Sequence, residues 1–325
     1  MLIDNALLRF DEIRVRYDGA KGFKRREITA VDGVTLSVGC GETLGLVGES
    51  GCGKSTLAKA ILGLVKISSG QMFFGGNQLH RDGVRRSSEL RSQMQLVFQN
   101  PKGALNPMRK VGRSLEAAAL LGGSSNRAEA RGRVLKILEE VGLEPLKTIE
   151  SRPWQLSGGQ CQRICIARAL LVGPKLLICD EPVASLDAIV QVQIIDLLAR
   201  MKAQHNLTML FISHDLAVVR RVSDRVAVMY MGRLCEMGSS EEVYSAPAHP
   251  YTAMLLGAIP HIGKSKSKRT EHRPFGEMPS ALNPPSGCRF RTRCDKATAI
   301  CSDEEPQLTE IGNHRYAACH HPLSF

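Results

Sequence analysis

Nine consecutive residues have the types and the spacing of a phosphate-binding loop. The segment Gly48-Glu-Ser-Gly-Cys-Gly-Lys-Ser-Thr56 fits the pattern G-x-x-x-x-G-K-[ST], and it lies between the apolar run 44–47 and a helix-like run that begins at Leu57. Glycines allow backbone N–H groups to surround phosphate oxygens, and the following helix presents the positive end of its dipole. A chance glycine-rich turn is the alternative, but the two flanking runs disfavour it.

We therefore expect this loop to bind the phosphates of a nucleotide. Lys54 is predicted to reach the β- and γ-phosphates, and the Ser55 hydroxyl is predicted to ligate Mg²⁺. The full set of expected binding residues in the loop is Gly48, Ser50, Gly51, Cys52, Gly53, Lys54, Ser55 and Thr56.

Two adjacent carboxylates follow another apolar run. The segment Lys175-Leu-Leu-Ile-Cys-Asp-Glu-Pro182 is typical of a buried strand that ends at Asp180 and Glu181, which places both at the carboxyl edge of a sheet, where α/β proteins bind ligands. We predict that Asp180 holds Mg²⁺ through water, and that Glu181 accepts a proton from the water that attacks the γ-phosphate. Acidic pairs are commonly solvated surface, but such surface seldom follows four apolar residues.

A third motif, Leu156-Ser-Gly-Gly-Gln160, lies between the loop and the acidic pair. A Ser-Gly-Gly turn that opens the helix-like run 161–170 would make a second anion-binding helix N-terminus. Together and in this order, the three motifs resemble the signature of the ATP-binding-cassette (ABC) ATPases. The resemblance implies that two chains enclose two nucleotides, each contacted by the signature turn of the other subunit. The residues of this turn are Ser157, Gly158, Gly159 and Gln160.

The same resemblance assigns roles to residues that are weak signals when taken alone. It implies that Gln99 senses Mg²⁺ and the attacking water, and that His214 hydrogen-bonds the γ-phosphate. Asp187 would couple the two sites across the dimer, and Tyr17 would stack on adenine, although a tyrosine at a strand end is equally typical of a core. ATP and Mg²⁺ are then the expected cofactors.

Short β-rich runs alternate with helix-like stretches, which is typical of an α/β protein. Between Val111 and Leu146 the β signal vanishes and apolar residues recur at helical spacing. With the resemblance, this predicts an α/β P-loop NTPase of the ABC ATPase type, with an inserted helical subdomain and a small irregular, cysteine-containing C-terminal domain. The expected domains are a nucleotide-binding domain at 1–260, with the helical subdomain at about 100–172, and an extension at 261–325.

The composition of the 325 residues, 43% of them hydrophobic, is that of an ordinary globular protein. The sequence shows no apolar run of the roughly 18 residues that a membrane-spanning helix needs, and the residues from Met1 onward do not have the layout of a signal peptide. We therefore expect a location on the cytoplasmic side. The net charge of +11 is compatible with a nucleic acid, an anionic membrane surface or a phosphate-rich ligand, and by itself it selects none of them.

Three further segments resemble the dipeptide/oligopeptide/nickel importer branch of the ABC family. They are Val97-Phe-Gln-Asn-Pro-Lys-Gly-Ala-Leu-Asn-Pro107, His249-Pro-Tyr-Thr252 and Gly276-Glu-Met-Pro-Ser-Ala-Leu-Asn-Pro-Pro-Ser-Gly-Cys288. The phosphate loop and the Gln99-Asn-Pro101 segment are more similar to an F-type ATPase than to its D-type partner. The resemblance implies a heterodimer with a second, D-type ATPase beneath two membrane permease subunits, on the cytoplasmic face of a bacterial membrane. An extracytoplasmic binding protein would deliver peptides, while nickel or another peptide-like cargo remains open.

Two other functional classes share the nucleotide chemistry. ABC ATPases that act on nucleic acid or ribosomes usually have two cassettes or a long coiled-coil insertion, so we expect no nucleic acid partner for this single cassette. Exporters more often fuse the cassette to membrane spans, which this sequence does not show.

Four cysteines, separated by five, six and seventeen residues, crowd into a proline-rich tail with few apolar residues. They are Cys288, Cys294, Cys301 and Cys319. Because disulfides are improbable in a reducing cytoplasm, a centre with four thiolates is the physical candidate, either Zn²⁺ or a [4Fe–4S] cluster. The resemblance to the importer branch implies the cluster, with four free thiols as the alternative. We expect a structural role because no phosphate-handling residue lies nearby in the sequence, and we expect the six other cysteines to be reduced thiols.

Overall fold

The computed structural model describes residues 6–19, 26–79, 87–259, 277–312 and 314–323. The chain divides into two compact units, with residues 1–84 and 213–325 in unit 1 and residues 85–212 in unit 2. The expected domain boundary near residue 261 lies outside the described residues, so the division into domains at that point stays a prediction.

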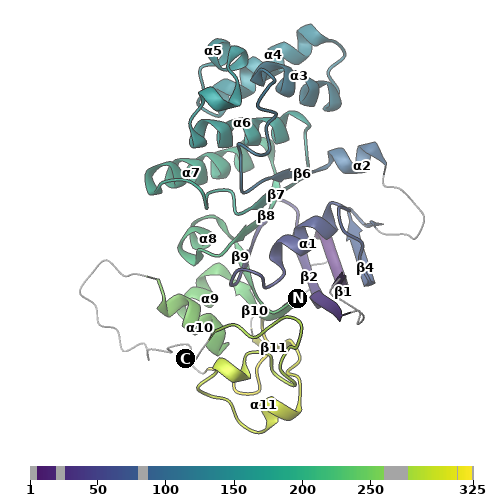
Figure 1. Cartoon of the computed structure of the whole chain (residues 1–325), viewed down its shortest axis with the longest axis vertical. Helices are drawn as coiled ribbons and strands as arrows, with labels where there is room; N and C mark the ends of the chain where they lie inside the picture. The colour runs from purple at the N-terminus through teal and green to yellow at the C-terminus, as the bar shows by residue number, and fades with distance from the viewer. Residues whose placement is uncertain (1–5, 20–25, 80–86, 260–276, 313, 324–325) are drawn as a thin grey trace. The chain divides into compact units, whose positions relative to one another are not determined.

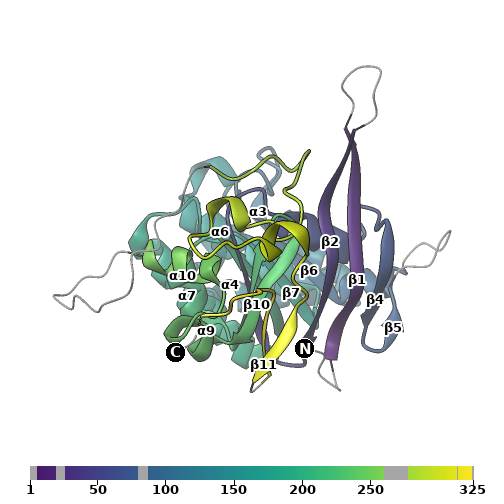
Figure 2. The same ribbon diagram turned by 90° about the horizontal axis from the view of Figure 1, so that it is seen from below.

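The first sheet of unit 1 is antiparallel and has the strand order β2-β1-β4-β5. Its strands are β1 (Ala6–Gly19), β2 (Arg26–Gly39), β4 (Ser69–Phe74) and β5 (Asn77–Gln78), and Figure 2 shows β1 between β2 and β4. Buried residues alternate along β1 at Leu8 and Phe10 and again at Ile13 and Val15. The period shifts by one residue at Glu12, whose φ of 52° and shifted pairing mark a β-bulge.

The other strands of unit 1 form part of a mixed sheet. They are β3 (Thr43–Val47), β9 (Arg225–Tyr230), β10 (Arg233–Ser239), β11 (Thr309–Gly312) and β12 (Arg315–Ala317). Strand β3 is buried along its whole length and runs parallel to β9, while β9, β10, β12 and β11 pair antiparallel in that order. The β9–β10 turn, Met231-Gly232, has φ values of 43° and 86°, as a two-residue hairpin of type I′ requires. The C-terminal residues thus extend the same sheet as β3.

The helices of unit 1 connect and cover these strands. They are α1 (Lys54–Ile61), α8 (Leu216–Val222), α9 (Ser240–Ser245), α10 (Pro250–Gly257) and α11 (Ile300–Asp303), with a 3₁₀ turn at Arg291–Arg293.

Asp32 on β2 ties several segments of unit 1 together. Its carboxylate accepts hydrogen bonds from Arg14 Nε on β1 at 3.1 Å and from Arg233 Nη2 on β10 at 2.8 Å, and it pairs with Arg289 of the C-terminal region. Burial opposes ionisation, but the hydrogen bond and charge of Arg233, with the charge of Arg289 and the hydrogen bond of Arg14, hold the pKa of Asp32 below its usual value. One carboxylate therefore braces β1, β2, β10 and the C-terminal region.

Unit 2 contains three parallel strands, β6 (Met94–Val97), β7 (Leu176–Asp180) and β8 (Thr208–Ser213), of which the last residue of β8 already belongs to unit 1. Val97 lies opposite Cys179, and Asp180 lies opposite Ile212, so the strands end at the same edge. The helices are α2 (Ser88–Ser92), α3 (Val111–Leu121), α4 (Arg127–Glu140), α5 (Pro145–Glu150), α6 (Gly158–Leu171) and α7 (Ala188–His205), with a 3₁₀ turn at Pro153–Gln155.

Helices α3, α4 and α5 pack on one another, and α3 and α4 also pack on α6, as Figure 1 shows. The guanidinium of Arg133 on α4 donates to the carbonyls of Ala119 and Gly122 at the end of α3 and to the carbonyl of Leu171 at the end of α6, at distances of 3.2, 3.0 and 2.8 Å. These helices form the inserted helical layer, and the predicted α/β class with a helical insertion is confirmed.

Candidate active site

The loop between β3 and α1 closes around the side chain of Lys54. This lysine is only 4% exposed, and its Nζ donates to the carbonyl oxygens of Gly48 at 2.6 Å and Glu49 at 3.0 Å. The ammonium group is therefore held inside the loop, as the motif predicts for a residue that meets phosphate oxygens there.

Two glycines of the loop are required by their surroundings. Gly48 has a φ of 152°, and a Cβ there would lie 2.1 Å from the carbonyl oxygen of Met229. Gly53 has a φ of 111°, and a Cβ there would lie 2.2 Å from the carbonyl oxygen of Ala30. No side chain fits at either position without moving the backbone, which explains the glycines physically.

Other expected binding residues surround the start of α1. Ser50, Gly51 and Ser55 are exposed, whereas the Cys52 side chain is buried. The Tyr17 hydroxyl lies 3.5 Å from the Thr56 hydroxyl, and 37% of the Tyr17 residue is exposed. The structure thus brings the expected adenine-stacking residue to the phosphate loop with part of its surface available.

The carboxyl edge of unit 2 carries the acidic pair. Asp180 is the last residue of β7, and the Gln99 side chain, two residues beyond β6, donates from Nε2 to Glu181 Oε2 at 3.1 Å. Glu181 has a φ of 49°, and its backbone N–H donates to the carbonyl of Ile212 at 2.9 Å. The structure therefore brings Gln99, which the family resemblance singled out, to Glu181 at the edge where the strand pattern predicted the acidic pair.

The Ser-Gly-Gly turn opens α6 as expected. The Ser157 hydroxyl accepts from the Gln160 N–H at 3.2 Å, and Gln160 Oε1 accepts from the Ser157 N–H at 2.9 Å, which forms a capping box. Asp187 caps α7 by accepting from the Val190 N–H at 3.0 Å. A Cβ on Gly159 would lie 2.6 Å from Val190 Cγ1, so the turn packs directly against the start of α7.

His214 follows β8 and precedes α8, and it is exposed. The next residue, Asp215, caps α8 by accepting from the N–H groups of Ala217 at 2.8 Å and Val218 at 3.3 Å. His214 belongs to unit 1 with the phosphate loop, whereas Gln99 and Glu181 belong to unit 2.

The C-terminal region contacts the phosphate loop through residues that the sequence motifs did not single out. Arg293 donates to both carboxylate oxygens of Glu49, at 2.6 and 2.9 Å, and the Tyr251 hydroxyl accepts from the Glu49 N–H at 2.9 Å. The hydrogen bond from Arg293 to Glu49 holds the pKa of Arg293 above its usual value. Tyr251 lies in the segment 249–252, which resembles the importer branch, and Arg293 adjoins Cys294.

Comparison with known proteins decides the family. Residues 31–184 match the model described as ABC transporter, and residues 235–301 match the model described as the C-terminal region of oligopeptide/dipeptide transporters. The chain is 44% identical to the oligopeptide transport ATP-binding protein OppF of Haemophilus influenzae, over 91% of this chain and 90% of that protein. It is 41% identical to the di/tripeptide transport ATP-binding protein DppF of Pseudomonas aeruginosa, over 95% of both chains.

The chain belongs to the ABC transporter family.

Solved structures of ABC cassettes have the same fold. The structure of cbiO1 from Clostridium perfringens, part of the ABC transporter complex cbiONQ, has a TM-score of 0.64 and 30% identity, and it covers 74% of this chain and 92% of that chain. A dimeric post-hydrolysis state of the cassette MJ0796 bound to ADP and Pi has a TM-score of 0.62 and 27% identity, covering 72% of this chain and 98% of that chain. The predicted P-loop NTPase fold is confirmed, and this ABC protein is an ATPase.

In the parts of this ABC ATPase that the structure describes, none of the helices combines the length and the apolar character that crossing a membrane requires.

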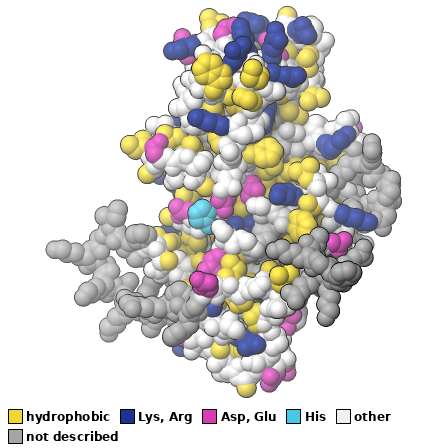
Figure 3. Space-filling model, in the orientation of Figure 1, with side chains coloured by type: hydrophobic (Ala, Val, Ile, Leu, Met, Phe, Trp, Pro, Cys, Tyr) yellow, Lys and Arg dark blue, Asp and Glu magenta, His cyan; other side chains and the backbone are white. Residues whose placement is uncertain are grey.

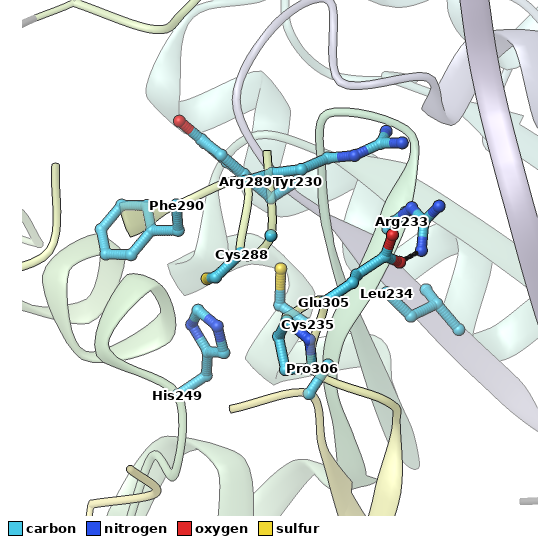
Figure 4. Close-up of a pocket in the computed structure, with 12 residues that line it drawn as sticks. Tyr230, Arg233, Leu234, Cys235, His249, Cys288, Arg289, Phe290, Glu305 and Pro306 are labelled. Carbon is cyan, nitrogen blue, oxygen red and sulfur yellow. Dashed lines mark ion pairs between the residues drawn. The ribbon is translucent and has the colours of Figure 1, made fainter. Parts of the chain in front are cut away.

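The four late cysteines of this ABC ATPase line one small pocket, together with His249, His320 and His321. A neighbouring pocket, drawn in Figure 4, contains Cys288 again and Cys235 of β10. All ten cysteines carry free thiols.

The pocket supplies the donors for the expected metal centre but not its geometry. Within the described ranges, no group of three or more His, Cys, Asp or Glu side chains is arranged to hold a metal ion. The arrangement therefore gives no support to the expected [4Fe–4S] cluster.

The expected structural role of the metal centre stays a prediction, but the C-terminal region does contact the phosphate loop. No phosphate-handling residue lies near these cysteines in the sequence, but Arg293, beside Cys294, contacts Glu49 inside the phosphate loop. The separation of 244 residues between Arg293 and Glu49 hid this contact from the sequence.

Proposed function

We propose that this ATPase energises the import of short peptides. The observation that carries the proposal is the match of residues 235–301 to the C-terminal region of oligopeptide/dipeptide transporters, on a chain with a complete set of ABC motifs. Relatives named for oligopeptide and di/tripeptide transport match more than nine-tenths of the chain, which supports the same cargo class. Nickel and other peptide-like cargo are the alternatives that the test must separate.

In this proposal the phosphate loop binds the phosphates of ATP through its N–H groups and Lys54. Gln99 Nε2 donates to Glu181 Oε2 and so orients the carboxylate, which in this proposal accepts a proton from water. Glu181 is thus the general base, and His214 hydrogen-bonds the γ-phosphate. Tyr17 stacks on adenine.

Magnesium is the metal that this chemistry requires. The sequence motifs and the family resemblance together assign Mg²⁺ to the Ser55 hydroxyl, the Asp180 carboxylate and the Gln99 amide, each of which offers an oxygen donor of the type that Mg²⁺ prefers. The bound ion would neutralise charge that develops on the phosphates.

A second subunit completes each nucleotide site in this proposal. Ser157 and Gln160 are exposed at the start of α6, and Asp187 is exposed at the start of α7, which supports the proposal that both turns meet an ATP molecule on another chain. We propose that this partner is a D-type ATPase, that the pair works on the cytoplasmic face of a bacterial membrane beneath two permease subunits, and that an extracytoplasmic binding protein delivers the cargo.

The test reconstitutes the transporter from this chain, its partner ATPase and the permeases in proteoliposomes. Binding protein loaded with a tripeptide should stimulate ATP hydrolysis and drive uptake of the labelled tripeptide, whereas the same assembly carrying Glu181→Gln should do neither. If the binding protein stimulates hydrolysis only when it is loaded with nickel, and not with the tripeptide, the cargo is nickel and the peptide assignment is wrong. Hydrolysis that responds to nucleic acid and to no binding protein would contradict transport altogether.

We further propose that Cys288, Cys294, Cys301 and Cys319 bind a metal centre, with a [4Fe–4S] cluster as the first expectation. The support is the donor set: four thiols line one pocket in a region with few apolar side chains. Anaerobic purification followed by iron, sulfide and zinc analysis tests it. One equivalent of zinc without iron would exclude the cluster, and a metal-free protein with a folded C-terminal region would exclude the centre.

A further inference from the structure

Side chains on the segment between Cys288 and Cys294 attach the C-terminal region to the surroundings of the phosphate loop. Arg289 pairs with Asp32 and donates to the carbonyl of Met231 at the tip of the β9–β10 hairpin. The Phe290 ring packs against Tyr230 and Tyr251, with centroids 5.4 and 5.3 Å apart, and part of this contact surface is visible in Figure 4. Arg289 and Phe290 thus fix the segment just N-terminal to Arg293, the residue that contacts the phosphate loop itself.

The hairpin tip that receives Arg289 is itself hydrogen-bonded to the loop. The Gly232 N–H donates to the carbonyl of Cys52 at 2.7 Å, and the Gly232 carbonyl accepts from the Asp32 N–H at 2.9 Å. The loop, the hairpin tip and the C-terminal segment therefore form one hydrogen-bonded layer.

Glu49 is held at each of its polar groups. Its N–H donates to the Tyr251 hydroxyl at 2.9 Å, its carbonyl accepts from Lys54 Nζ at 3.0 Å, and its carboxylate accepts two hydrogen bonds from Arg293. Glu49 thus accepts the two hydrogen bonds from Arg293 through its carboxylate and holds Lys54 through its backbone carbonyl. Any shift of the Glu49 backbone changes where the Lys54 ammonium is held.

The Arg293–Glu49 pair is shielded from water on the arginine side. The Arg293 side chain is 6% exposed and that of Glu49 is 27% exposed. The guanidinium carbon also lies 5.9 Å from the ring centroids of both Tyr230 and Phe290. A guanidinium in such surroundings is costly without its carboxylate, and the two parallel hydrogen bonds fix the direction of the pair.

We infer that Arg293 is a positioning residue for the nucleotide site, acting through Glu49 on the loop that holds Lys54. The inference rests on the proposed function, which places the phosphates of ATP in this loop. Arg293 does not itself contact the nucleotide: it fixes the loop in the shape that binds one. Through this contact, the C-terminal region affects how tightly the phosphate loop binds a nucleotide.

The test measures ADP binding, with Mg²⁺, to the full chain by isothermal titration, using Arg293→Gln, Glu49→Gln and the double variant. Each single change should raise the dissociation constant on the order of tenfold, and the double variant should be no weaker than the worse single variant, because both remove the same pair. Arg293→Lys keeps the charge but not the bidentate geometry, so its affinity should lie between those of wild type and Arg293→Gln. In the assembled ATPase, the KM for ATP should rise by a larger factor than kcat falls.

Arg291→Gln is the matched control, since Arg291 lies in the same 3₁₀ turn but donates to Ser286. It should bind ADP as wild type does. If Arg293→Gln does not fold, Glu49→Gln and Arg293→Lys carry the same expectations. Wild-type affinity in both single variants, or losses that multiply in the double variant, would overturn the inference.

Lys54→Ala separates this inference from the proposed function beneath it. Unchanged ADP affinity in that variant would mean that the loop is not the phosphate site, and both proposals would fall. Weakened binding in Lys54→Ala together with wild-type binding in Arg293→Gln and Glu49→Gln would leave the site in place and remove only the role of Arg293.

Discussion

Glu181 combines a positive φ with a hydrogen bond from its own N–H to Ile212, so its backbone is fixed in a conformation that most side chains avoid. Its carboxylate is then presented to Gln99 at the edge of the sheet. If Glu181 is the general base, as proposed, it requires little rearrangement before proton transfer.

We expect Glu181→Gln to lower the ATP turnover of the assembled ATPase by about 10² to 10⁴, because the positioned proton acceptor is lost while its shape is kept. ATP binding should persist, since Lys54 and the loop are unchanged. Steady-state hydrolysis and nucleotide retention measured on the same preparation check this prediction. Near-wild-type turnover would show that another group is the base.

Gly159→Ala should destabilise unit 2 by about 1–3 kcal/mol, because the added Cβ meets Val190 Cγ1 at 2.6 Å. Gly158→Ala is the milder comparison, since its nearest atom, Leu186 Cδ2, would be 3.3 Å away. Thermal unfolding measures both, and Val190→Ala should relieve the loss in the Gly159 variant. Equal effects at the two glycines would argue against this contact.

At the scale of the elements, strands and helices were predictable wherever a local pattern determines them. The buried run 43–47, the loop 48–56 and the helix after it are contiguous, so their order in the sequence already predicts their order in space. The contact of Gln99 with Glu181 spans 82 residues and was expected only through the family resemblance. The ties of Arg293 to Glu49 and of Arg289 to Asp32 cross more than 240 residues and depend on how the C-terminal region packs, which no local pattern encodes.

Asp32 should make its contribution to stability pH-dependent, because its pKa is lowered in the folded chain. A carboxyl group whose pKa is lower in the folded chain than in the unfolded chain stabilises the fold at pH values above the unfolded pKa, which is near 4. This contribution is lost as the pH falls through the pKa of the folded chain. Asp32→Asn should therefore cost about 1–3 kcal/mol at pH 7, and the difference from wild type should shrink in acid.

Unfolding of wild type and Asp32→Asn at a series of pH values from 7 downward measures that difference. Asp18→Asn, at an exposed aspartate of β1, provides the comparison and should have little effect at any pH. A difference that stays constant across the series would mean that ionisation of Asp32 is not what braces the strands.

At the scale of the whole molecule, the helical insertion carries part of the net positive charge. Figure 3 shows Lys and Arg side chains over α3, α4 and α5, where the exposed basic residues are Arg113, Arg127, Arg131, Lys136 and Lys147. Residues 111–150, which contain these helices, have six Lys and Arg and six Glu residues and so no net charge, whereas the whole predicted insertion at 100–172 has twelve Lys and Arg against six Glu, which is +6 of the chain's +11. The amino-acid composition gives only the total charge, so it could not show whether the basic residues lie on the helical insertion or around the nucleotide site.

The subunit alone should hydrolyse ATP poorly, because its Ser157 turn and its phosphate loop are proposed to serve different nucleotides. Addition of the partner ATPase should restore turnover, and the specific activity should rise with total protein concentration before it saturates. Phosphate release measured across a dilution series provides the check. Full turnover that is independent of concentration in a monomeric preparation would contradict the shared site.

The clamp made by Arg133 has a mechanical consequence. The Arg133 guanidinium donates hydrogen bonds to carbonyls at the ends of both α3 and α6. Fraying of either helix end therefore breaks a hydrogen bond to the same arginine that holds the other end. Helix α6 has 14 residues and is therefore about 21 Å long, and its opposite end is the turn at Ser157. Force applied to the end of α3 would therefore be transmitted through Arg133 to α6, the helix whose other end is the turn at Ser157.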